Sequence, residues 1–128
     1  MTLKSVIAQI KTVPAGTAVS YGHTFVCDRK TTLATVPIGY ADGLPRLASG
    51  NFKVSVNGHL ASGVGRVCMD QCMIDITGIE HVEENMPVTI FGADGITIEE
   101  YSACCQTISY EAFCRIGKRV PRIYYPKK

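Results

Sequence analysis

The chain has 128 residues, of which 46% are apolar and 19% charged, and its formal net charge is +2. A chain of this length forms one domain of ordinary size, which buries roughly two-thirds of its unfolded surface without needing a disulfide or a metal. The composition excludes intrinsic disorder, the small charge does not favour a nucleic-acid partner, and no apolar run approaches the roughly 18 residues of a membrane-spanning helix.

The first half of the chain predicts short strands separated by turns rich in glycine and proline. Three extended segments are predicted, at residues 3–13, 17–21 and 31–38. Apolar and polar residues alternate over residues 52–56, which predicts a half-buried strand. Asn57-Gly58 follows directly, and this pair is the strongest two-residue signal for a β-hairpin.

The second half predicts more strands and two helices. Segments rich in β-branched and apolar residues predict strands at 67–76, 87–91 and 120–125. Thr97-Ile-Glu-Glu100 is a capping box, which predicts a helix from this point to about Gln106. Ser109 is expected to cap a second short helix over residues 110–116, which ends at Gly117.

These elements predict a mainly β fold, with two short helices near the C-terminus. A small antiparallel β-barrel is the expected arrangement, because closing the sheet hides the edges of many short strands. No repeat or linker divides the sequence, so residues 1–128 are expected to form a single domain. A strand that starts at residue 2 or 3 favours an excised domain to which a methionine was added.

Six cysteines raise the question of a disulfide or metal site. No C-x-x-C pair occurs, Cys68 and Cys72 have a poor spacing for zinc, and the three histidines are scattered. We therefore expect no metal and six reduced thiols that act as small apolar side chains. The N-terminus carries no export signal, so a cytoplasmic protein is expected.

Four segments of the chain say more about its function than its composition does. They are Val19-Ser20-Tyr21-Gly22, G-Y-A-D-G-L-P-R at 39–46, G-R-V-C-M-D-Q at 65–71, and T-I-S-Y-E at 107–111 followed by Arg119-Val-Pro-Arg122. In this order the set resembles the C-terminal domain of bacterial alanine racemase. The resemblance covers nearly the whole chain.

The resemblance implies a two-domain enzyme of which this chain is only the second part. In the family, an N-terminal (β/α)₈ barrel carries pyridoxal phosphate on a lysine, and a mainly β domain completes the site across a homodimer. The barrel is absent here, since 128 residues cannot hold one. The implied partners are thus the barrel domain, a second subunit and a small amino acid, with no nucleic acid and no membrane. The implied activity is interconversion of L- and D-alanine for peptidoglycan synthesis, and the isolated chain is expected to be inactive.

The resemblance assigns three residues to the reaction. By motif match, Tyr21 is the acid or base that serves one face of the α-carbon, opposite the cofactor lysine. The backbone amide of Met69 meets the substrate carboxylate, and Tyr110 reaches the cofactor phosphate with a neutral hydroxyl. Tyr110 also favours alanine, because some relatives that act on serine carry a different residue there. A phenol has a pKa of about 10, so a base of this kind near neutral pH needs a cation close by.

Further residues match the surroundings of the family's site. Tyr40, Arg46 and Arg66 match residues that line the substrate access channel, where arginine suits a carboxylate. Asp42 is expected to fix the glycine-rich turn by accepting hydrogen bonds from backbone amides. The two arginines of the R-V-P-R segment are expected to have structural roles.

Three other interpretations remain open at this point. The chain could be a non-catalytic β-barrel interaction module whose motifs serve the fold and a partner. It could belong to a racemase that acts on serine or another small amino acid. A related two-domain pyridoxal decarboxylase carries a cysteine–aspartate motif, which C-M-D at 68–70 matches only superficially.

Overall fold

The computed structural model describes residues 1–126, and within them the fold is built on a seven-stranded antiparallel sheet. The strands follow the order β1-β9-β6-β7-β8-β5-β2. Their bounds are Leu3–Val6 (β1), Gln9–Val13 (β2), Thr31–Val36 (β5), Lys53–Val56 (β6), His59–Val64 (β7), Cys72–Asp75 (β8) and Pro87–Phe91 (β9). A separate small sheet pairs Ala18–Val19 (β3) with Phe25–Val26 (β4).

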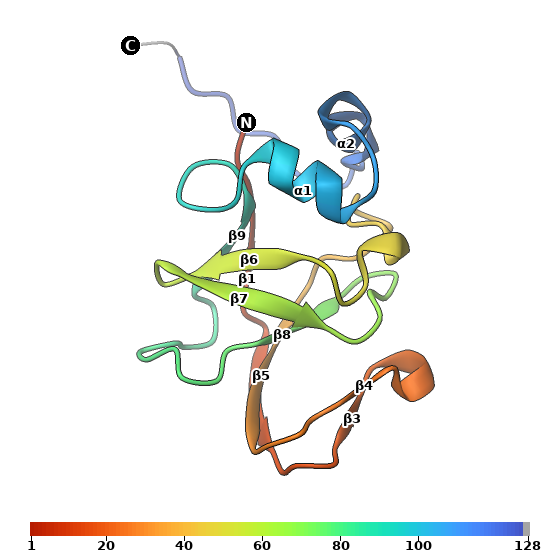
Figure 1. Ribbon diagram of the computed structural model, residues 1–128. Helices are drawn as coiled ribbons and strands as arrows, with labels where there is room; N and C mark the ends of the chain where they lie inside the picture. Colours follow the sequence, from red (N-terminus) through yellow and green to blue (C-terminus); the bar gives the residue numbers. More distant parts are fainter. Residues whose placement is uncertain (127–128) are drawn as a thin grey trace.

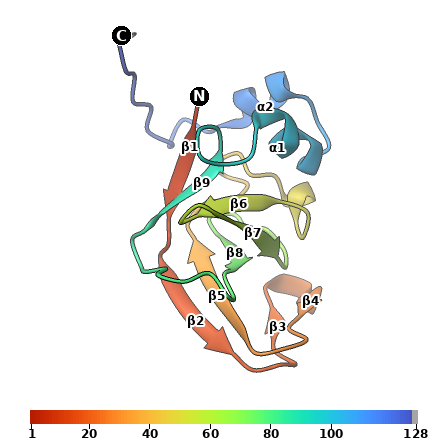
Figure 2. The same ribbon diagram turned by 60° about the vertical axis from the view of Figure 1, so that its left-hand side comes forward.

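The described part of the chain also contains short helical segments. Two single turns of 3₁₀-helix are Tyr21–His23 (η1) and Arg46–Ala48 (η2), and the α-helices are Ile98–Cys104 (α1) and Ser109–Arg115 (α2). Figures 1 and 2 show α1 and α2 together at one end of the sheet, above β6 and β9. The small sheet and η1 lie at the opposite end. The expected mainly β fold with two helices near the C-terminus is confirmed.

The sheet curls into a barrel because its two end strands are consecutive parts of one bent segment. β1 pairs with β9 and β2 pairs with β5, yet only residues 7 and 8 separate them. Ile7 N–H donates to Met86 O at 2.9 Å, and Ala8 N–H donates to Thr35 O at 2.8 Å. The prediction of one strand over 3–13 was therefore wrong: the chain changes partners at the buried Ile7 and forms two strands.

Local signals in the sequence placed the hairpin and the first helix correctly. Asn57 and Gly58 join β6 to β7 with φ angles of 48° and 76°, the positive values that a tight hairpin turn requires. Thr97 Oγ1 accepts from Glu100 N–H at 3.1 Å, and Glu100 Oε2 accepts from Thr97 N–H at 2.7 Å. The capping box is thus confirmed, although α1 ends at Cys104.

Three other local predictions differ from the structure, and one short strand was missed. In the segment predicted at 67–76 only β8 is a strand, because residues 67–71 form a loop. The segment 120–125 forms no strand, and the short strand β4 was not predicted. Ser109 is the first residue of α2, and the N-cap position is Ile108, so Ser109 is not the cap.

The core is apolar and holds three of the cysteines as small buried side chains, Cys27, Cys72 and Cys105. Phe91 and Tyr101 pack with ring centroids 4.9 Å apart, and Tyr101 Oη donates to Gly43 O at 3.0 Å. Burial raises the pKa of the Cys72 thiol to about 12, with a smaller contribution from Cys68. The Cys72 thiol is therefore a neutral filler near physiological pH.

Residues 1–126 lack two further features. Neither α-helix is long and apolar enough to cross a bilayer. No group of three or more histidine, cysteine or acidic side chains is placed to hold a metal ion.

Candidate functional site

The segments that carry the four motifs lie on one side of the barrel. In both views η1 stands at the lower right, α2 at the upper right, and η2 between them. We call the three loops on this side loop A (residues 20–23), loop B (39–46) and loop C (65–71). Specific backbone and side-chain contacts join them to one another.

Loop A packs directly on loop C. Ser20 Oγ donates to Arg66 O at 2.7 Å and lies 3.6 Å from Cys68 Sγ. Ser20 itself has a φ of 65°, a value uncommon for a residue with a side chain. The contact fixes the backbone next to Tyr21, whose side chain is 73% exposed.

Gly65 is the residue that lets loops A and C approach. Its φ is +70°, and a Cβ at this position would lie 2.8 Å from both Val19 O and Ser20 Cβ. Gly50 has nearly the same φ, +71°, but a Cβ there would meet nothing within 4 Å. Comparing alanine substitutions at Gly65 and Gly50 therefore separates two effects on stability. Both substitutions carry the cost of a positive φ, but only the one at Gly65 adds a steric clash.

This comparison gives a prediction for stability. Gly65→Ala should lower the free energy of unfolding by about 1–3 kcal/mol more than Gly50→Ala, because only Gly65 would force loop A away from loop C. Urea unfolding of the two variants measures the difference. Equal losses for the two variants would show that the packing at Gly65 contributes nothing.

Loop B lies against the other part of loop C. Tyr40 N–H donates to Cys68 O and Ala41 N–H donates to Met69 O, both at 3.0 Å. A Cβ at Gly39 would lie 2.2 Å from Cys68 O, so only glycine allows this approach. The backbone of loop C is thus held from both sides, by loop A and by loop B.

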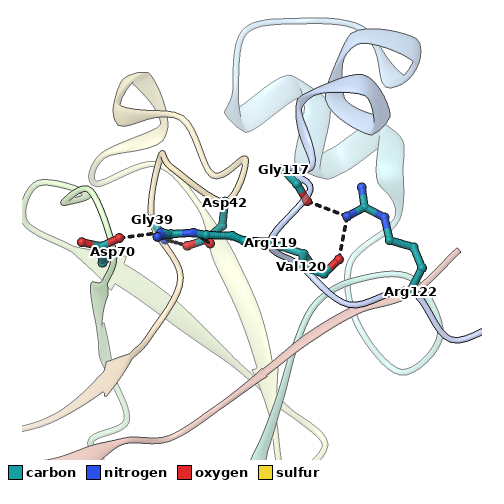
Figure 3. A network of polar contacts seen from close by, with 7 residues as sticks. All are labelled: Gly39, Asp42, Asp70, Gly117, Arg119, Val120 and Arg122. Carbon is teal, nitrogen blue, oxygen red and sulfur yellow. Dashed lines mark hydrogen bonds and ion pairs between the residues drawn. The ribbon is translucent and has the colours of Figure 1, made fainter.

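Asp42 fixes the turn of loop B as expected, since its Oδ2 accepts from Gly39 N–H at 2.9 Å. Its other oxygen, Oδ1, accepts from Arg119 Nε at 2.6 Å. Arg119 also donates through Nη2 to Asp70 Oδ1 of loop C at 2.5 Å. Figure 3 shows the Arg119 guanidinium between the two carboxylates, with Gly39 beside Asp42. The two hydrogen-bonded carboxylates, Asp42 first, raise the pKa of Arg119, so its charge persists throughout the accessible pH range.

Arg122, the second arginine of the R-V-P-R segment, binds backbone oxygens instead. Its Nη1 donates to Gly117 O and Val120 O, and its Nη2 donates to Ile116 O at 2.7 Å. Figure 3 shows this side chain folded back on its own segment. It ties the chain that follows α2 into a compact turn.

Met69 is exposed at the tip of loop C. Its side chain is 55% exposed. Its carbonyl is engaged by Ala41, but its N–H donates to no group among residues 1–126. Loop C therefore presents a free backbone donor next to an uncovered apolar side chain.

Tyr110 stands near the start of α2 with its side chain 80% exposed. The far end of the same helix is joined to loop B, because Gly117 N–H donates to Asp42 O at 2.8 Å. A Cβ at Gly43 would lie 2.8 Å from Arg115 O, which shows how closely α2 and loop B pack. No hydrogen bond within residues 1–126 joins Tyr110 to Tyr21, and the elements that carry them, α2 and η1, stand at opposite ends of this side.

The three residues matched to the access channel lie on loops B and C. Tyr40 is 44% exposed, Arg46 begins η2 and is exposed, and Arg66 is half-buried. A Cβ at Gly22 would lie 3.9 Å from Arg66 Nε, so this guanidinium is next to loop A. Ser49 links η2 to loop C by donating to Arg46 O at 2.5 Å and accepting from Val67 N–H at 2.8 Å.

A cleft of about 410 Å³ opens beside loop A. Its lining includes Tyr21 and Ser20 of loop A, Cys68 and Gln71 of loop C, and Lys11 of β2. Of the residues assigned to the site from the sequence, only Tyr21 borders it. The cleft by itself is therefore not a complete site for the proposed roles.

The sequence did not predict how three residues join the loops on this side. They are Ser20, Asp70 and Arg119, which bridges loops B and C. All three lie inside the quoted motifs, so the motifs contained the signal. Their contacts span 46, 49 and 77 residues along the chain, which no local pattern reveals.

Comparison with known proteins identifies the same family along nearly the whole chain. The family model described as "Alanine racemase, C-terminal domain" matches residues 1–124. Alanine racemase 2 of Oceanobacillus iheyensis is 53% identical over 127 residues, which are 97% of this chain and 32% of that protein. The alanine racemase of Desulforamulus reducens is 48% identical over 124 residues, 97% of this chain and 34% of that protein.

Solved structures give the same result. Alanine racemase from a D-cycloserine-producing Streptomyces lavendulae aligns over 99% of this chain and 34% of its own, with a TM-score of 0.93 and 44% identity. Alanine racemase from Bartonella henselae, solved with covalently bound pyridoxal phosphate, aligns over 97% of this chain and 34% of its own, with a TM-score of 0.93 and 34% identity. The chain thus spans about a third of the length of the relatives it matches.

Proposed function

Because the chain belongs to the alanine racemase family, in which it corresponds to the C-terminal domain, we propose that it is the C-terminal third of a racemase that interconverts L- and D-alanine. The main support is the exposure of Tyr21, Met69 and Tyr110 on segments that are bonded to one another.

In this proposal each exposed group has one task. Tyr21 Oη gives or takes the proton on one face of the substrate α-carbon, and inversion of the stereocentre requires a second group on the other face. The free N–H of Met69 donates to the substrate carboxylate. Tyr40, Arg46 and Arg66 line the route by which a zwitterionic substrate arrives, where a guanidinium matches a carboxylate.

The residues of this chain fit one margin of a bound pyridoxal phosphate. Tyr110 Oη is an exposed neutral donor, which suits a phosphate oxygen, and it has no hydrogen-bond partner within residues 1–126. When bound, the cofactor supplies an electron sink that stabilises negative charge at the α-carbon. The lysine that carries it belongs, in our proposal, to the N-terminal barrel, and the site is shared across a homodimer. The product D-alanine would feed peptidoglycan synthesis in the cytoplasm.

The experiment that tests this proposal joins the missing part to the chain. We call the product the two-domain protein: this chain fused to the N-terminal barrel of its own full-length protein or of the Oceanobacillus iheyensis relative. It should form D-alanine from L-alanine and show the visible absorption band of bound pyridoxal phosphate. A folded two-domain protein that binds the cofactor and makes no D-alanine would contradict the proposal.

The 128-residue chain alone should neither racemise alanine nor bind the cofactor tightly. Tyr110 offers one neutral hydrogen bond, worth about 0.5–1.5 kcal/mol, whereas micromolar binding requires about 8 kcal/mol. Tyr21 also serves only one face of the α-carbon, so the proton-transfer pair is incomplete. D-alanine assays and cofactor titration of the isolated chain check this, and turnover by the chain alone would refute the shared site.

A further inference from the structure

We propose that Arg119 is a positioning residue for this reaction: bonded to Asp42 and Asp70, it holds loop C in the orientation that aims the Met69 N–H at the substrate. This inference rests on the proposed function for the role of Met69. It gives Arg119, which is not assigned a contact with the substrate, a measurable effect on substrate binding.

The geometry of Arg119 is that of a bridge between two loops. Nε binds Asp42 of loop B at 2.6 Å and Nη2 binds Asp70 of loop C at 2.5 Å. The planar guanidinium can serve both carboxylates at once, which a lysine ammonium on a flexible stem does much less well. Figure 3 shows the Arg119 side chain reaching past Asp42 toward Asp70.

Asp42 gives the bridge a fixed foundation. Its side chain is only 12% exposed, and its second oxygen is already bonded to Gly39 N–H. Its backbone oxygen accepts from Gly117 N–H, two residues before Arg119. The carboxylate that binds Arg119 Nε therefore has little freedom to move, and it fixes one end of the guanidinium.

Asp70 is the end of the bridge that matters for the site. It directly follows Met69, its side chain is 62% exposed, and Arg119 is its only side-chain partner among residues 1–126. The backbone bonds from Tyr40 and Ala41 hold the Cys68 and Met69 carbonyls. Arg119 adds a side-chain restraint on Asp70, the residue that directly follows Met69, and so limits how far the Met69 backbone can turn.

Two variants separate positioning from folding. Asp70→Ala removes only the exposed end of the bridge and leaves the Asp42–Arg119 pair intact, so the fold should persist. Arg119→Lys keeps the charge but cannot bridge both carboxylates in the same way. Arg29→Ala is the matched control, because it breaks the Arg29–Asp75 ion pair (3.3 Å) in a part of the chain that carries no motif.

The first measurement uses the two-domain protein. Both variants should raise the KM for alanine about tenfold and change kcat by less than about twofold, because they weaken binding of the carboxylate in ground state and transition state alike. Arg29→Ala should leave both constants unchanged. An unchanged KM in both variants would overturn the positioning role.

The second measurement does not depend on activity. In the 128-residue chain, amide hydrogen exchange at Tyr40 and Ala41, the two donors to loop C, should be about tenfold faster in both variants than in the control. Faster exchange with an unchanged KM would make Arg119 merely structural and overturn the inference. If the unsubstituted two-domain protein made no D-alanine, the proposed function would fail. The exchange measurement would still test the bridge: unchanged exchange rates at Tyr40 and Ala41 in both variants would reject it.

Discussion

Replacing Tyr21 by phenylalanine in the two-domain protein is expected to lower the rate of alanine racemisation by about 10²–10⁴-fold, the usual contribution of a general acid or base. The visible absorption band of bound pyridoxal phosphate should be unchanged, because Tyr21 is not among the groups assigned to hold the cofactor. The expected loss is in kcat, since the hydroxyl acts only while the proton moves.

The structure makes this substitution a clean test. The Tyr21 side chain is 73% exposed and its hydroxyl has no partner within residues 1–126, so removing the oxygen breaks no contact that holds the fold. The residue before Tyr21 is held by the hydrogen bond from Ser20 Oγ to Arg66 O, which the variant retains. The free energy of unfolding should therefore match that of the unsubstituted chain to within about 0.5 kcal/mol.

Tyr124→Phe is the matched control for Tyr21→Phe. Tyr124 is also an exposed tyrosine, but it lies outside the matched motifs. Its variant should racemise alanine at the normal rate. Near-normal turnover in Tyr21→Phe would reject the assignment of this hydroxyl, and loss of the absorption band would mean that Tyr21 holds the cofactor instead.

Much of the fold could be predicted because its determinants are local. The Asn57-Gly58 turn needs positive φ at both residues, and the Thr97 capping box satisfies two amides within three residues of sequence. Such features depend only on residues close together in the sequence, so the sequence alone can predict them. The barrel itself could be expected from the number of short strands and the need to cover their edges.

The errors arose where distant contacts decide the local structure. Residues 3–13 have an unbroken strand pattern, but the sheet closes only if the chain bends at Ile7 and bonds to Met86 and Thr35. Residues 67–71 look extended, yet contacts with loops A and B hold them as a loop. Residues 120–125 have β-forming side chains but pair with no neighbouring strand.

The candidate site shows the same division. The motifs predicted which segments carry Tyr21, Met69 and Tyr110, and the structure adds that these segments are bonded together and lie on one side of the barrel. The ion pairs from Arg119 to Asp42 and Asp70 could not be predicted, because they join residues 77 and 49 positions apart. Charged side chains in a motif do not by themselves reveal their partners.

In a homodimer, Tyr21 could serve the cofactor of its own subunit or that of the partner subunit. We propose that it serves the cofactor of the partner subunit in a homodimer. A mixed dimer of a Tyr21→Phe subunit and a subunit that lacks the barrel lysine then contains one intact site, with the lysine from the first and the tyrosine from the second. Each parent variant alone contains none.

Mixing these two inactive variants under conditions that exchange subunits is the most direct test of the account. Random exchange makes half of the dimers mixed, and each holds one working site of two, so about a quarter of the unsubstituted activity should return. Tyr124→Phe, mixed in the same way with the lysine variant, shows the activity that a subunit with an intact Tyr21 restores. If exchange is demonstrated and the mixture of the two inactive variants still forms no D-alanine, this chain does not complete a site across the dimer, and the central claim is contradicted.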